Sequence, residues 1–158
     1  MRAIDVRVYL VCVEKLSRLR GEVKPISMAQ GVPSMKVLVI DDNPAVRDMV
    51  AVALARAGHD AVVANNGWEG LALAERESID AVVTDVFMPE CDGIEVVRAL
   101  RERRRGLPLV AMSGGSLSLG QEFLKMAEHL GASATLRKPF EPRELVAVLE
   151  ALGRRVPA

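Results

Sequence analysis

The chain has 158 residues, half of them hydrophobic and only 3% aromatic, and its formal net charge at pH 7 is zero. This length fits one domain with an aliphatic core. The balanced net charge gives no indication of the basic surface that binds nucleic acids or membranes. The cysteines, Cys12 and Cys91, do not suggest a disulfide framework, and no apolar run reaches the roughly 20 residues of a membrane helix, so we expect a soluble cytoplasmic protein.

Residues 1–34 carry the least regular pattern. A short apolar patch is followed by a stretch rich in lysine and arginine, and the patch is too short for a secretory signal. A weak amphipathic helix is one interpretation, and a loosely attached tail ending in a proline- and glycine-containing linker is the one we favour. We therefore predict a poorly ordered N-terminal extension or linker over residues 1–34, a domain over residues 35–153 and a tail over residues 154–158.

From Met35 onwards, short apolar runs alternate with segments of helical periodicity. The runs are rich in β-branched residues and end at polar or glycine-containing segments, which is typical of buried strands. The predicted strands are residues 37–40, 61–64, 81–85, 107–112 and 134–138. Strands that are apolar at nearly every position and are separated by helices indicate right-handed crossovers. We therefore predict an α/β fold, a doubly wound parallel sheet with helices on both faces.

Helix signals occupy the segments between these strands. Proline suits the first helical position and predicts helix starts at Pro44 and Pro142. Asp92 is followed three residues later by a glutamate, which is the spacing of a capping box. Glycines predict helix ends at Gly58 and Gly131, so each strand is expected to be followed by a helix.

Four further side chains carry predictions about burial. Trp68 has the spacing of an inward-facing residue on the helix that follows Gly67. His59 and His129 lie beside glycines at the ends of elements and are expected to be exposed. Cys91, in the loop after the third strand, is expected to be a small apolar filler.

Polar side chains stand where four of the apolar runs end. Asp41 and Asp42 follow the first run, Asp85 ends the third, Ser113 follows the fourth and Lys138 follows the fifth. The carboxyl ends of parallel strands meet at one edge of the sheet, where open α/β sheets bind their ligands. All five side chains are therefore expected to converge on a single site.

The residue types at this site favour phosphoryl chemistry. Two carboxylates about 4 Å apart repel by about 4 kcal/mol at an effective dielectric of about 20, so three acids need a cation, and their hard oxygen atoms suit Mg²⁺. Lys138 can pair with a phosphoryl oxygen, and Ser113 offers a hydroxyl donor. An aspartate can be the nucleophile and form an aspartyl phosphate, and the transfer depends mainly on positioning and charge neutralisation.

Residues 35 to about 152 resemble the receiver domain of two-component response regulators. The resemblance rests on several short motifs that occur in the family's order, each at the end of a strand. They are the acid pair Asp41-Asp42, the phosphoacceptor Asp85, Met88-Pro89 with Asp92-Gly93, the switch residue Ser113, and Lys138-Pro139-Phe140. The resemblance implies a flavodoxin-like five-stranded sheet of order 2-1-3-4-5.

The resemblance also implies a set of Mg²⁺ ligands. In the family's pattern Asp42 and Asp85 bind the ion directly, Asp41 binds it through water, and the backbone carbonyl of Phe87 completes the protein ligands. It further implies a cis peptide bond between Lys138 and Pro139, an isomer that only about 5% of such bonds adopt.

The chain departs from the family's pattern at three positions. Thr135 stands where many receivers have an aromatic switch residue, so signal readout by an aromatic flip is not expected. Phe87 and Gly115, two residues beyond the acceptor and two beyond the switch hydroxyl, cannot orient a water molecule. We therefore expect a phosphoryl group that hydrolyses slowly.

Simpler roles for these residues also exist. Asp42 or Asn43 could be only a helix cap, and Lys138 by itself could be a solvated surface charge. The combination of the acid pair with Asp85 and Lys138 in strand-end positions favours the functional interpretation.

We therefore expect a single-domain response regulator that accepts a phosphoryl group from a histidine kinase on Asp85 and catalyses only its own phosphorylation and dephosphorylation. Few residues follow Leu152, so the signal is expected to leave through protein contacts around residues 113–135, or by onward transfer to a histidine phosphotransfer protein. A monomer or weak homodimer is expected. The alternatives are a phosphohydrolase with an aspartyl nucleophile and a binding module that works without phosphorylation.

Overall fold

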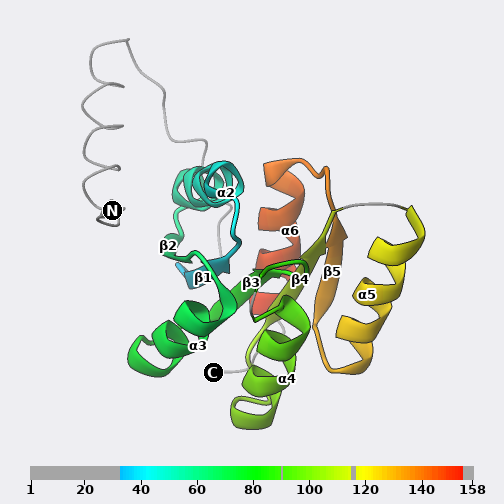
Figure 1. Cartoon of the computed structure of the whole chain (residues 1–158). Coiled ribbons are helices and arrows are strands. Elements are labelled where there is room, and N and C mark those ends of the chain that lie inside the picture. The colour runs from blue at the N-terminus through cyan, green and yellow to red at the C-terminus, as the bar shows by residue number, and fades with distance from the viewer. Residues whose placement is uncertain (1–32, 90, 115–116, 155–158) are drawn as a thin grey trace.

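The computed structural model describes residues 33–89, 91–114 and 117–154 (Figure 1). The strands within these ranges are β1 (Lys36–Ile40), β2 (Asp60–Ala64), β3 (Ala81–Asp85), β4 (Leu109–Ser113) and β5 (Ala134–Arg137). The helices are α2 (Pro44–Arg56), α3 (Gly67–Arg76), α4 (Gly93–Arg103), α5 (Leu117–His129) and α6 (Pro142–Gly153). The predicted N-terminal extension and C-terminal tail lie outside the described residues, apart from residues 33, 34 and 154.

The five strands form one parallel sheet in the order β2-β1-β3-β4-β5. This confirms the predicted doubly wound α/β fold and its strand order. The order reverses direction between β1 and β3, and such a switch point in an open α/β sheet is where ligands bind. Every residue of β3 is buried, so the strand at the centre of the sheet is covered on both faces.

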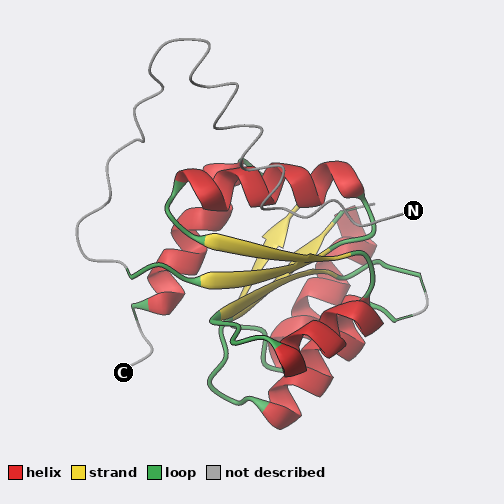
Figure 2. Cartoon of the chain, turned by 90° about the vertical axis from the view of Figure 1, so that its left-hand side faces the viewer, coloured by secondary structure: helices red, strands yellow, loops and turns green. Residues whose placement is uncertain are grey.

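Helices cover both faces of the sheet, and alternate residues of each strand face opposite layers (Figure 2). Val37 and Val39 of β1 pack in the cluster that contains buried residues of α2 and α6. Leu38 and Ile40 pack in the cluster beneath α3 and α4. Helix α5 contacts β4 and β5, so it covers the part of the second face beside α4. The strands that carry the acids, β1 and β3, are therefore packed against helices on both faces of the sheet.

Most of the predicted helix signals have the expected structure. The side chain of Asp92 caps α4 by accepting a hydrogen bond from the backbone N–H of Glu95 at 2.9 Å. Pro44 and Pro142 are the first residues of their helices. Gly58 and Gly131, after the ends of α2 and α5, have φ angles of 84° and 106°, which glycine adopts without steric cost.

The fourth strand begins at Leu109, two residues later than predicted. The residues before it form a turn, in which the backbone N–H of Leu107 donates to the carbonyl of Arg104 at 3.1 Å. Pro108 has no N–H to donate, so the apolar run starts before the regular strand does.

The prediction that Trp68 faces inward is wrong, because its side chain is 59% exposed. The buried positions of α3 are instead small residues, Gly67, Gly70 and Ala74. A Cβ atom on Gly70 would lie 2.3 Å from Cδ1 of Ile40, so α3 approaches the sheet too closely for a large inner side chain. The large aromatic side chain therefore lies on the outer side of the helix.

The histidines have opposite environments. His129 is exposed, as predicted, but the prediction that His59 is exposed is wrong, because only 5% of its surface is accessible. Its Nδ1 accepts a hydrogen bond from the backbone N–H of Met35 at 3.3 Å, and its Nε2 lies 3.6 Å from Glu150 of α6. Cys91 is fully buried, as predicted, and burial raises the pKa of its thiol to about 11. None of the helices in the described ranges combines the length and hydrophobicity that a membrane crossing requires.

Candidate functional site

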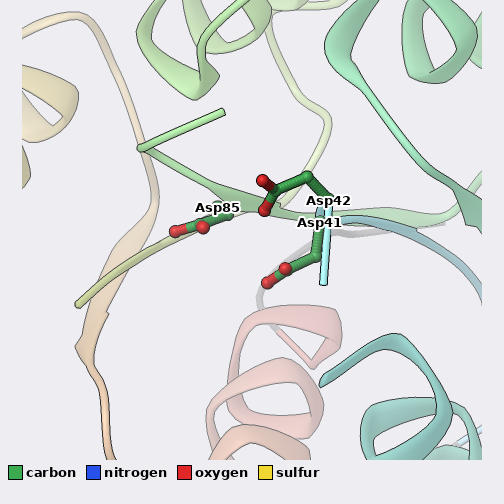
Figure 3. Close-up of side chains that lie close together, drawn as sticks. All are labelled: Asp41, Asp42 and Asp85. Atoms are coloured by element: carbon green, nitrogen blue, oxygen red, sulfur yellow. The ribbon is translucent and has the colours of Figure 1, made fainter. Parts of the chain in front are cut away.

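Three carboxylates meet at the carboxyl edge of the sheet. Asp41 directly follows β1, Asp42 is the next residue, and Asp85 is the last residue of β3, which pairs with β1. Each side chain offers an oxygen atom within 4.8 Å of the oxygen atoms that the other two offer (Figure 3). Asp41 and Asp85 are buried, and Asp42 is exposed. The predicted convergence of the acids is therefore present in the structure.

Asp41 is held by several hydrogen bonds. Its Oδ1 accepts from the backbone N–H of Asn43 at 2.9 Å, and its Oδ2 accepts from Nζ of Lys138 at 2.7 Å. Its backbone carbonyl accepts from Nη1 of Arg47 at 2.6 Å. No motif in the sequence predicts a role for Arg47. An arginine near the start of the helix that follows an acid pair is the signal that could find it.

Lys138 brings a positive charge to the acids from the far strand of the sheet. Its Nζ lies 2.7 Å from Oδ2 of Asp41 and 3.2 Å from Oδ2 of Asp85, so one ammonium bridges both buried acids. The next peptide bond, to Pro139, is cis, as the resemblance implies. The Lys138 side chain is only 20% exposed, so Lys138 is not the freely solvated surface charge that was the simpler alternative.

Asp85 keeps one oxygen atom unused. Its Oδ2 faces Lys138, whereas its Oδ1 is buried and has no hydrogen-bond partner among the described residues. Burial raises the pKa of the Asp85 carboxyl, the Lys138 ammonium opposes this shift, and the nearby Asp41 charge adds to it. A buried carboxylate oxygen without a hydrogen-bond donor raises the free energy of the folded protein. A bond from this oxygen to a phosphoryl group or to a cation would relieve that cost.

The hydroxyl-bearing residues are bonded locally. Ser113 ends β4, one residue beyond Met112, which pairs with Asp85 on β3. Ser113 is buried, but its hydroxyl donates to the backbone carbonyl of Gly114 at 3.2 Å. Thr135 Oγ1 donates to Glu128 Oε1 on α5 at 2.8 Å, so Thr135 is not among the residues that gather at the acids. The roles predicted for both residues stay predictions.

Phe87 lies two residues beyond Asp85, and its side chain is 42% exposed. Its ring packs edge to face against Phe123 of α5, with 4.8 Å between the ring centroids and 68° between the ring planes. The role predicted for its carbonyl as a metal ligand stays a prediction. Gly115, which carries the companion prediction about water, lies outside the described residues.

The cluster fits a hard divalent cation. Three carboxylates face one ammonium, so negative charge is in excess, and all the donor atoms are oxygens, which suits Mg²⁺. Both oxygen atoms of Asp41 already accept hydrogen bonds from the protein, which fits contact through water better than direct contact. Asp42 and Asp85 are therefore the two acids of the cluster that suit direct contact.

Comparison with known proteins places this arrangement in context. A family model described as "Response regulator receiver domain" matches residues 37–150. The chain is 37% identical over 121 residues to the alkaline phosphatase synthesis transcriptional regulatory protein PhoP of Bacillus subtilis. The matched region covers 76% of this chain and 49% of PhoP. It is 36% identical over 123 residues to a 14.6 kDa protein of Leptolyngbya boryana, with coverages of 77% and 92%. The chain spans about half the length of the first curated relatives that it matches.

Solved structures give the same result. Chemotaxis response regulator CheY4 of Vibrio cholerae matches with a TM-score of 0.68 and 32% identity, over 76% of this chain and 99% of CheY4. The receiver domain of NtrX from Brucella abortus matches with a TM-score of 0.71 and 27% identity, over 76% of this chain and 99% of that domain.

Proposed function

Because this chain belongs to the response regulator receiver domain family, we propose that it accepts a phosphoryl group from a histidine kinase on Asp85. The signal then passes to other proteins through surface contacts, or the phosphoryl group moves on to a histidine phosphotransfer protein. The chain is a phosphoacceptor in this proposal, and the only reactions it promotes are its own phosphorylation and dephosphorylation. A cytoplasmic location and a monomeric or weakly dimeric state belong to the same proposal.

The observation that carries the proposal is the asymmetry of the Asp85 carboxylate. Oδ2 lies 3.2 Å from the Lys138 ammonium, and Oδ1 has no hydrogen-bond partner among the described residues. The ion pair favours the anionic form of the buried acid, which is the nucleophilic form. The free oxygen atom can then form a new bond without first giving up a hydrogen bond.

In the transfer step, Oδ1 of Asp85 forms a bond to phosphorus as the bond between phosphorus and the donor imidazole nitrogen breaks. The imidazole keeps the electron pair of the broken bond. Lys138 would pair with a phosphoryl oxygen, and the hydroxyl of Ser113 would turn from Gly114 to do the same. Both contacts neutralise charge, which is the main protein contribution to phosphoryl transfer.

Asp42 and Asp85 would hold Mg²⁺ directly, Asp41 would hold it through water, and the Phe87 carbonyl would complete the protein ligands. When bound, the ion supplies charge neutralisation for the phosphoryl oxygens. The excess negative charge of the three acids supports this assignment.

The test is reaction with acetyl phosphate and Mg²⁺, followed by intact mass spectrometry and phosphate release. We expect one phosphoryl group per chain in the wild type and none in Asp85→Asn. Asp92→Asn is the matched control, because it changes an acid of the same loop to an amide but keeps a good helix cap. Continuous phosphate release without a stable adduct would favour the phosphohydrolase, and no reaction would favour a binding module.

A further inference from the structure

Helix α5 contacts three segments of the sheet around the site: the end of β4, the loop after β3, and strand β5. Three of its residues each meet one of these segments: Gly120 meets Ser113, Phe123 meets Phe87, and Glu128 meets Thr135. A change at the acids could therefore reach α5 by any of three contacts. The burial and packing of each contact decide which of the three can transmit a change from the acids to α5.

Two of the contacts are weak links. The hydrogen bond from Thr135 to Glu128 joins side chains near the surface, where water replaces a lost partner at little cost. Gly120 has no side chain and presents only its backbone to Oγ of Ser113, which lies so close that an added Cβ atom would be 3.2 Å from it, a tight contact. The Ser113 hydroxyl donates its hydrogen bond to Gly114 and not to Gly120, so this contact involves no side chain of α5 and no hydrogen bond.

The contact between Phe87 and Phe123 has a different character. The edge-to-face geometry at 4.8 Å between centroids is a favourable arrangement for two aromatic rings. Phe123 packs against the buried cluster that includes Val86, Ala111 and Leu124, so its ring is fixed to the core. Phe87 is the exposed partner, on the loop that leaves the acceptor strand.

The backbone connects Phe87 closely to the acceptor. Val86, between Asp85 and Phe87, is held by a hydrogen bond from its N–H to Met112 and by one that its carbonyl accepts from Gly93. Phe87 is therefore the residue where the loop first becomes free to respond to a change at Asp85.

We propose that the ring contact between Phe87 and Phe123 couples the occupancy of the acid site to the position of α5. It does so in a chain in which Thr135 replaces the aromatic residue that would otherwise link β5 to the readout. This inference rests on the proposed function, because it assumes that the acid site takes up a phosphoryl group.

Coupling between two sites is reciprocal, so one contact predicts two effects. Breaking the contact weakens the response of α5 to occupancy of the acid site. It also changes the affinity of the acid site, although Phe123 lies on another element. An edge-to-face pair is worth enough to change that affinity roughly two- to tenfold.

The experiment uses the full chain with Mg²⁺ and beryllofluoride, which imitates a phosphoryl group on a carboxylate. Beryllofluoride affinity and hydrogen exchange of the α5 amides are measured for wild type, Phe123→Ala, Phe123→Leu, Phe87→Leu and the double variant Phe87→Leu/Phe123→Leu. Phe123→Leu keeps an apolar core residue if the alanine variant does not fold. Met126→Ala is the matched control, because Met126 is a 49% exposed side chain on the same helix.

We expect the wild-type α5 to change its exchange on beryllofluoride binding, and the Phe123 variants to bind with an altered affinity and a smaller α5 response. The double variant should add little to either single one, and Met126→Ala should match the wild type. Normal binding with an unchanged α5 response in the Phe123 variants would overturn the coupling and leave the proposed function standing. A wild type that binds no beryllofluoride and forms no adduct with acetyl phosphate would overturn both.

Discussion

The acid side and the hydroxyl side of the site differ in how completely the fold assembles them. On the acid side, Lys138 already bridges Asp41 and Asp85 at 2.7 and 3.2 Å. On the hydroxyl side, Ser113 donates to the carbonyl of its neighbour Gly114, and Thr135, which does not reach the acids, donates to Glu128 of α5. An unpaired buried charge costs several kcal/mol, whereas a hydroxyl changes partners for about 1 kcal/mol. The fold thus preassembles the charges and leaves the hydroxyls able to rearrange.

The largest effect on the acid side is expected from Gly93→Ala. A Cβ atom at this position would lie 2.0 Å from the backbone carbonyl oxygen of Asp85, and backbone cannot move aside cheaply. We expect a loss of about 3 kcal/mol in the free energy of unfolding, measured by urea denaturation. Gly106→Ala is the control, because an added Cβ there meets nothing within 4 Å. Equal stabilities of the two variants would contradict the close approach of α4 to the acceptor strand.

Lys138→Met separates the two sides directly. It removes the charge that bridges the buried acids, so we expect the free energy of unfolding to fall by roughly 2 kcal/mol. The loss stays below that of a fully buried pair because the Lys138 side chain is 20% exposed. Ser113→Ala, on the hydroxyl side, should cost less than about 1 kcal/mol, because only a bond to Gly114 is lost. The reverse order in urea denaturation would show that the hydroxyl side, not the acid side, is preassembled.

Phe87→Asn is expected to speed the loss of the phosphoryl group from Asp85 about tenfold, which is about 1.4 kcal/mol in the barrier. The asparagine amide can orient an attacking water molecule, and the phenyl ring cannot. The measurement is phosphate release after removal of acetyl phosphate. Phe87→Leu is the control, since it removes the ring without adding a polar group. If Phe87→Asn releases phosphate at the wild-type rate or more slowly, the inability of Phe87 to orient a water molecule does not explain a slow decay.

The smallest effect is a gain in stability from Asp85→Asn, about 1 kcal/mol at pH 7 in the presence of a chelator. Burial raises the pKa of Asp85 above its ordinary value of 3.8, so the folded state binds the proton more tightly than the unfolded state does. Wild-type stability is therefore lost as pH rises from 3.8 through the folded-state pKa. The gain from the substitution should be absent below pH 3.8 and appear above it, as urea denaturation against pH would show. A gain that is the same at every pH would contradict this origin.

Local sequence pattern determined the strand and helix sequence of the fold and the edge at which the acids lie. The β-branched runs before Asp41 and Asp85 are typical of strands that are buried between helices. In a parallel sheet the carboxyl ends of such strands lie at the same edge. The helix cap at Asp92 and the helix ends at Gly58 and Gly131 are equally local, since each depends on the backbone of its own few residues.

Tertiary structure alone decided which partners these residues meet. Lys138 contacts Asp41 across 97 positions of sequence, and the bond from Arg47 to the Asp41 carbonyl depends on the angle at which α2 leaves the strand. Trp68 is exposed because α3 lies too close to Ile40 for a large inner side chain, a distance that periodicity does not encode. The pairing of Phe87 with Phe123 has the same origin: a hydrophobic pattern specifies that a side chain seeks a partner, and only the packing of helix on sheet selects which one.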